Sequence, residues 1–177
     1  MLTSTIYDDV KALLEEMGTR DPREILKEKG VELLPFREPT KVLGMYKVIL
    51  GYDYIFYNPN LEENLTNMVL AHELGHVIYH SDYEEVLHIN LFGAGAEEVE
   101  ANLFAAHLLI PDENIHDYIE KGYNVGQMAM SEYVDVNLMM IKLKDLMKMK
   151  LIPKIDLNLN GDFFKKIDGR NEDNWEY

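Results

Sequence analysis

The sequence predicts an α+β fold in which helices open the chain, a small sheet follows, and further helices close it. Apolar residues recur at helical spacing up to Met17 and again after residue 60. Between these regions, the stretch 42–58 is rich in β-branched and aromatic residues, which favour strands. With 177 residues, 47% of them apolar, the chain can bury the core of a single domain.

The first elements are two helices and a strand. The first helix is expected to end at Met17, because Gly18 supplies a stop signal. Asp21 and Pro22 predict the start of a second helix, with the aspartate as its cap and the proline in its first turn, and this helix should end near Gly30. The strand candidate V-E-L-L-P-F follows directly.

A hairpin is expected next, with strands near residues 42–49 and 53–58 and a turn between them. We expect these strands to form a small antiparallel sheet packed on the following helix, residues 61–80. Asn60 and Glu63 resemble a capping box at the start of that helix. The stretch 81–95 is interpreted as a linker, because its glycines do not match a phosphate-binding fingerprint.

The remaining elements are helical. The segment A-E-E-V-E-A-N-L-F-A-A-H-L-L-I predicts a strong helix that Pro111 stops. A short helix over 112–121 follows, and then two helices that meet at V-D-V-N, an arrangement similar to a helix-turn-helix. The second of these helices and its flank carry a basic stripe, made of Lys142, Lys144, Lys148, Lys150 and Lys154. A helical pair that closes the core is favoured over a DNA-reading element.

These elements predict three regions. Residues 1–111 would hold the N-terminal helices, the sheet and the two helices with the candidate site. Residues 112–152 would form a helical, helix-turn-helix-like part, and residues 153–177 an acidic tail.

Charge and composition narrow the possible functions. The net charge of −15 opposes broad binding to a phosphate backbone, so direct nucleic-acid binding is not expected. The chain has no cysteine, so any metal ligands must be histidines or carboxylates. Neither a signal peptide nor a membrane-spanning stretch is apparent, and we expect a soluble, cytoplasmic protein.

The stretch L-A-H-E-L-G-H-V-I-Y-H, residues 70–80, carries a candidate metal site. His72 and His76 are four positions apart, so on a helix they share one face and can bind a single ion. Glu73 lies roughly 100° around the helix, where it can reach a metal-bound water as a general base. The alternative is a helix that carries ordinary histidines, and a third ligand would decide between the two.

Three possibilities exist for the third ligand. His80 lies about 12 Å along the axis from His72, too far to share one ion, so it should cap or pack the helix end. A further histidine after a sharp glycine break is a second possibility, but the chain has Tyr79 and Asp82 at the positions which that pattern requires. A carboxylate from the following helix is the third.

Glu98 is the strongest candidate for that carboxylate. It shares a helical stripe with Ala101 and Asn102, where the alanine permits close packing of two helices. Asn102 could then form a hydrogen bond with a ligand histidine. Glu97 and Glu100 lie off the stripe and are expected to be solvated. Two histidines and a glutamate with an open fourth position are the ligands of a hydrolytic zinc site, although manganese, cobalt or iron could also bind.

The paired motifs resemble those of the ImmA/IrrE family of metallopeptidases. H-E-L-G-H followed by E-V-E-A-N-L-F-A-A-H-L-L-I-P is similar to the family pattern H-E-x-x-H, then E-x-x-A-N-x-F-A-x-x-L-L-x-P. The resemblance covers roughly residues 25–150, and it implies a compact gluzincin-like domain. By this resemblance His72, His76 and Glu98 would bind one zinc ion, and Glu73 would be the catalytic base. Known relatives are cytosolic bacterial proteins, often encoded on phages or integrative elements beside a helix-turn-helix repressor, which they cleave.

The predicted function is therefore that of a zinc-dependent endopeptidase that cleaves a repressor protein. One alternative is a non-catalytic anti-repressor that uses the same fold to bind its partner, and another is direct DNA binding through residues 123–150. The sequence does not single out the side chain that would stabilise the oxyanion.

Overall fold

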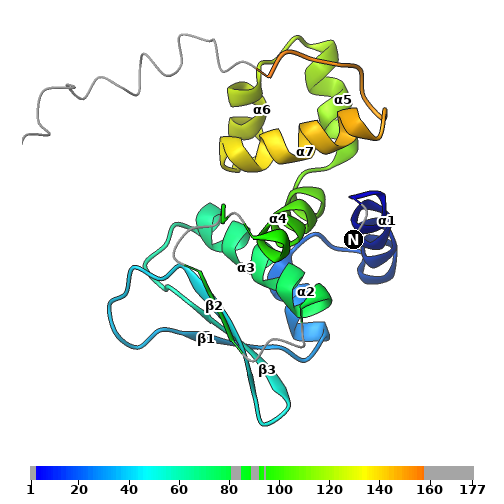
Figure 1. The fold of residues 1–177 in the computed structure, drawn as a ribbon. Helices are drawn as coiled ribbons and strands as arrows, with labels where there is room; N and C mark the ends of the chain where they lie inside the picture. Colours follow the sequence, from blue (N-terminus) through cyan, green and yellow to red (C-terminus); the bar gives the residue numbers. More distant parts are fainter. Residues whose placement is uncertain (1–2, 81–84, 89–91, 94, 158–177) are drawn as a thin grey trace, which may run out of the picture.

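The computed structural model describes residues 3–80, 85–88, 92–93 and 95–157, and Figure 1 shows their arrangement. The described residues form an α+β fold, as predicted, and they contain seven helices and four strands. The elements in chain order are α1 (Thr3–Met17), α2 (Pro22–Glu28), β1 (Glu32–Pro35), β2 (Gly44–Ile49), β3 (Tyr52–Tyr57), α3 (Glu63–Tyr79), β4 (Glu85–His88), α4 (Ala96–Leu109), α5 (Asp112–Glu120), α6 (Val125–Ser131) and α7 (Val136–Lys148).

The sheet has the strand order β1-β3-β2-β4. Strands β2 and β3 form the expected hairpin, closed by Leu50 and Gly51, whose φ angles of 54° and 81° suit a tight hairpin turn. The sheet is mixed rather than wholly antiparallel, because the chain reverses twice between β1 and β3, which therefore pair in parallel. The fourth strand, β4, pairs antiparallel with β2 and lies in the stretch that was expected to be only a linker.

Helix α3 occupies the centre of the molecule. Figure 1 shows the sheet on one side of α3 and α4, and the group α5–α7 beyond α4. Val69, Leu70 and Leu74 of α3 are fully buried, as are Tyr46 and Ile55 of the sheet. Such a helix, covered on nearly all sides, carries no clear amphipathic pattern and depends on tertiary packing for its stability.

The loop before α3 is stabilised by the side chain of Asn58 and not by the predicted capping box. The helix begins at Glu63 after Glu62, with no side-chain cap, so the predicted capping box is wrong. Instead, the Asn58 side chain accepts a hydrogen bond from the backbone nitrogen of Asn60 and donates one to the carbonyl of Thr40, each 3.0 Å long. The hydrogen bond from Asn60 to Asn58 forms an Asx turn, and this turn takes the place of a side-chain cap at the start of the helix.

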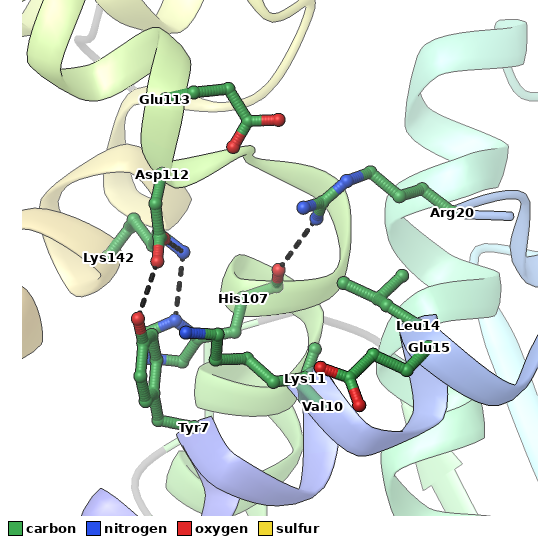
Figure 2. A pocket seen from close by; sticks show the side chains of 10 residues that line it. All are labelled: Tyr7, Val10, Lys11, Leu14, Glu15, Arg20, His107, Asp112, Glu113 and Lys142. Carbon is green, nitrogen blue, oxygen red and sulfur yellow. Dashed lines mark hydrogen bonds and ion pairs between the residues drawn. The ribbon is translucent and has the colours of Figure 1, made fainter. Parts of the chain in front are cut away.

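The C-terminal helices are attached to the rest of the fold through buried polar groups. Lys142 is 1% exposed, so it does not belong to an exposed basic stripe, and this weakens the case for DNA binding. Its Nζ lies 2.9 Å from Nδ1 of His107 and 2.5 Å from a carboxylate oxygen of Asp112 (Figure 2). Nε2 of His107 lies 2.9 Å from Asp145. These contacts link α4, α5 and α7 across residue 111, and the expected division there stays a prediction.

The surroundings of His107 favour its neutral form. Burial lowers the pKa of His107 below 6.5, and the Lys142 ammonium lowers it further, against the opposing effect of the Asp145 carboxylate. The neutral ring accepts from Lys142 at Nδ1 and donates to Asp145 from Nε2, which satisfies both nitrogens.

Among the helices described, none combines the length and apolarity needed to cross a membrane.

The buried histidine predicts a loss of stability in mild acid. The unfolded chain takes up a proton at this ring as the pH falls through 6.5, whereas the folded chain resists it, so this stabilisation is present above pH 6.5 and lost below. Between pH 7.5 and 5.5, we expect the free energy of unfolding in urea to fall by about 1 kcal/mol more for the wild type than for His107→Gln. The exposed His116→Gln should behave as the wild type, and equal falls in all three proteins would contradict this account.

Candidate metal centre

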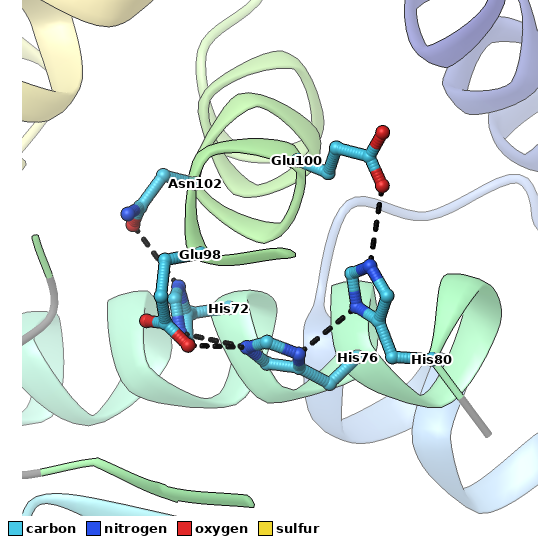
Figure 3. A network of polar contacts seen from close by, with 6 residues as sticks. All are labelled: His72, His76, His80, Glu98, Glu100 and Asn102. Carbon is cyan, nitrogen blue, oxygen red and sulfur yellow. Dashed lines mark hydrogen bonds and ion pairs between the residues drawn. The ribbon is translucent and has the colours of Figure 1, made fainter. Parts of the chain in front are cut away.

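Helix α3 places three polar side chains inside the fold. His72, Glu73 and His76 are each 0% exposed, which is unusual for such residues unless they have a special role. The two histidines lie one turn apart on one face of α3, and their Nε2 atoms are 3.2 Å apart (Figure 3). The four-residue spacing therefore produces the convergence that the sequence predicts.

Glu98, in the first turn of α4, completes the cluster. Its two carboxylate oxygens lie 3.4 Å from Nε2 of His72 and 3.5 Å from Nε2 of His76. One donor atom from each of the three residues falls within 4.8 Å of the others, and within the described part of the chain this is a group that could hold a metal ion.

Two glycines make this convergence possible. A Cβ at Gly75 of α3 would lie 2.9 Å from the Cα of Ala101, so the backbones of α3 and α4 approach each other closely at that point. A Cβ at Gly93 would lie 2.8 Å from Cγ of Glu98 and would displace its side chain. Ala101 was expected to permit close packing, whereas the contribution of Gly93 was not expected from the sequence.

The spacing of the two histidines suits a shared metal ion. Ligands bound at about 2.0–2.1 Å in tetrahedral geometry are about 3.3 Å from one another, close to the 3.2 Å between the two Nε2 atoms, and Glu98 presents a different carboxylate oxygen to each of them. The donor set of two imidazoles and a carboxylate suits zinc and is also accepted by manganese, cobalt and iron.

Asn102 orients the first histidine. Its Oδ1 lies 3.0 Å from Nδ1 of His72, and both side chains are buried. An amide oxygen can only accept, so Nδ1 carries the proton and Nε2 directs its lone pair toward Glu98. This is the contact that the stripe on α4 predicts for Asn102.

His80 and Glu100 orient the second histidine. Nδ1 of His80 lies 3.0 Å from Nδ1 of His76, and Nε2 of His80 lies 3.2 Å from Oε2 of Glu100. Because the carboxylate accepts from Nε2 of His80, the Nδ1 of His80 accepts in turn from Nδ1 of His76, whose Nε2 keeps its lone pair for a metal. His80 ends α3, as expected. The expectation that Glu100 is solvated was wrong, since its side chain is 22% exposed and holds His80.

Glu73 faces the sheet beneath Gly44 of β2. A Cβ at Gly44 would lie 2.5 Å from Oε1 of Glu73 and 2.7 Å from Cγ1 of Val69, so any larger residue would force the carboxylate to move. Sequence reasoning missed Gly44, although a glycine inside a strand often marks a close approach of another group.

The sequence matches the peptidase M78 family model, described as the IrrE N-terminal-like domain, over residues 16–143. The chain belongs to this family. The match includes α3 and α4 and so contains His72, His76 and Glu98. The chain is also similar to the "Uncharacterized immunity region protein 2" of Bacillus phage phi105, with 30% identity over 143 residues, which are 80% of this chain and 89% of that protein. The resemblance to ImmA/IrrE proteins is thereby confirmed at the level of the family.

Removal of the Glu98 carboxylate should remove one of three ligands. We expect Glu98→Ala to lose at least about 100-fold in zinc affinity, because a two-histidine site lacks the charge and geometry to retain the ion. A competition titration with a chromophoric chelator would measure this. Glu97→Ala is the matched control on the same helix turn and should bind as the wild type. Equal affinity of both variants would remove Glu98 from the ligand set.

The contacts behind His76 should affect metal affinity without supplying a ligand. We expect His80→Phe to weaken zinc binding about 10–100-fold while the stoichiometry stays at one ion, because His76 loses the group that fixes its protonated nitrogen. The d–d absorption spectrum of the cobalt-loaded chain should shift only slightly, since the ligands themselves remain. His116→Phe is the exposed control, and an unchanged affinity of His80→Phe would show that His80 only packs the helix end.

Proposed function

We propose that this chain is a zinc-dependent endopeptidase that cleaves and inactivates a helix-turn-helix repressor of a phage or mobile element. The observation that carries the proposal is a buried Glu73, adjacent in sequence to His72, on the helix whose two histidines come together with Glu98 in a group that could hold a metal ion. Peptidase membership supports hydrolysis of a peptide bond.

His72, His76 and Glu98 would hold one zinc ion. Zinc, when bound, polarises the scissile carbonyl and lowers the pKa of a water molecule. The Asn102 and His80–Glu100 contacts keep both histidines in the tautomer that binds a metal, so the site is arranged before substrate arrives.

Glu73 moves the proton. Its carboxylate takes a proton from the oxygen of the attacking water and delivers it to the nitrogen of the leaving amine. Gly44 and Val69 bound the space around the carboxylate, which limits the orientations that the side chain can adopt. Preorganisation of this kind lowers the entropic cost of reaching the transition state.

The substrate class rests on the relatives. The similar phage protein bears the name of an immunity region. The resemblance to the ImmA/IrrE family implies action on a repressor that is encoded nearby. A repressor works where the DNA lies, so we place the reaction in the cytoplasm. The absence of cysteine is compatible with a reducing compartment.

The decisive variant is Glu73→Gln. It keeps an isosteric side chain but cannot accept the proton, so we expect cleavage of the repressor encoded beside this gene to fall by on the order of 10²–10⁴-fold with zinc content unchanged. Gel analysis of the cleaved repressor and metal analysis of the same sample would measure both. Glu97→Gln, with the same change in charge, should cleave normally.

The same assay separates catalysis from binding alone. If Glu73→Gln and a His72→Ala, His76→Ala double variant both relieve repression as well as the wild type, the chain is a non-catalytic anti-repressor and the peptidase mechanism is wrong.

A further inference from the structure

A groove runs between α4 and α7 beside the metal centre. Its cavity of about 280 Å³ is lined mainly by apolar side chains, among them Val99 and Leu103 of α4 and Ile141 of α7. Val99 is 55% exposed and Phe92, at the same groove, is 37% exposed. Exposed apolar side chains gathered in a concavity are typical of a binding surface. We call this feature the α4–α7 groove.

The α4–α7 groove shares residues with the metal centre. Gly93 lines the groove, and its backbone abuts the side chain of Glu98. Asn102 also lines the groove and forms the hydrogen bond to His72. A polypeptide seated in the groove would therefore lie against residues that touch two of the three proposed metal ligands.

The rim of the groove is positively charged. Lys144 and Lys148 lie one turn apart on α7, and both are exposed. Asp145, also at the groove, is 5% exposed and bound to His107. Two exposed ammonium groups at an apolar groove are notable in a chain with a net charge of −15, whose overall field repels acidic partners.

We propose that the α4–α7 groove binds an apolar segment of the substrate protein that also carries acidic residues. Its apolar side chains would pack between Val99, Leu103 and Ile141, and its carboxylates would pair with Lys144 and Lys148. The groove is too small for a folded domain and takes the side chains of one segment, in the way that an amphipathic peptide binds a groove. This assignment rests on the proposed function for the identity of the partner, whereas the binding itself requires no hydrolysis.

Two dye-labelled peptides test the groove directly. Each has twelve residues with leucines four positions apart, and its charged positions are all glutamate in one peptide and all lysine in the other. Fluorescence anisotropy with the full-length Glu73→Gln chain avoids cleavage. We expect the glutamate peptide to bind at least about 10-fold more tightly, although the overall charge of the protein favours the lysine peptide.

Charge reversal provides the matched comparison. The Lys144→Glu, Lys148→Glu double variant should reverse the preference for the two peptides. The Lys121→Glu, Lys154→Glu variant makes the same change in net charge at exposed lysines elsewhere and should keep the original preference. Val99→Asp should weaken binding of the glutamate peptide at least about 10-fold. Met130→Asp, at a residue that is 56% exposed and outside the groove, should leave this affinity unchanged. Circular dichroism would confirm that each variant is folded.

Several results would overturn the proposal. A wild-type preference for the lysine peptide would do so, as would equal loss of binding in both lysine variants. If the protein is a dimer that Val99→Asp dissociates, the groove is a contact between copies. The acidic tail, residues 153–177, carries Phe163 and Phe164. If the glutamate peptide binds only after both are changed to serine, the tail of the chain itself occupies the groove.

Repressor cleavage separates this proposal from the proposed function. Cleavage that is lost in Glu73→Gln but unchanged in all groove variants would overturn the groove alone. Peptide binding with the expected preference, by a chain that cleaves no repressor, would overturn the proposed peptidase and leave the groove in place.

Discussion

The close contact between α3 and α4 is the constraint on which the candidate site depends. His72 and His76 are placed by the helical repeat alone, but Glu98 reaches them only because Gly75 lets the backbone of Ala101 approach. Any side chain at Gly75 would separate the two helices. The apolar surfaces buried on both helices supply the free energy that holds this contact, since two imidazoles and a carboxylate brought together would otherwise cost free energy.

The residues that contact His72 and His76 determine which ring nitrogen of each histidine carries the proton. Asn102 accepts from one ligand histidine, while Glu100 acts through His80 on the other, so each imidazole directs a lone pair to the same point. Two lone pairs and a carboxylate that lie close together are stabilised more by a bound cation than by a water molecule. The same helix that supplies Glu98 also borders the α4–α7 groove, and one helix therefore connects the proposed chemistry with the proposed recognition of substrate.

Local patterns predicted the parts of this structure that are local in origin. The hairpin follows from its β-branched and aromatic residues, the convergence of His72 and His76 from their four-residue spacing, and the stripe bearing Glu98 and Asn102 from its helical spacing, each within one segment. The parallel pairing of β1, the strand β4 and the Glu100–His80 contact depend on which distant segments meet, and no single segment encodes that. Lys142 shows the same limit. In the sequence it belongs to a group of lysines that was interpreted as a basic stripe, yet packing places it beside His107 and Asp112 in the interior.

The proposed function requires His72, His76 and Glu98 together to hold one zinc ion. X-ray absorption at the zinc edge of the full-length, zinc-loaded chain tests this most directly. We expect nitrogen and oxygen atoms at about 2.0–2.1 Å around the zinc ion, with the multiple scattering of two imidazoles and a coordination number of four. That scattering should be lost when both histidines are changed to alanine. A shell of oxygen atoms alone, or an imidazole signal that survives the double change, would contradict it.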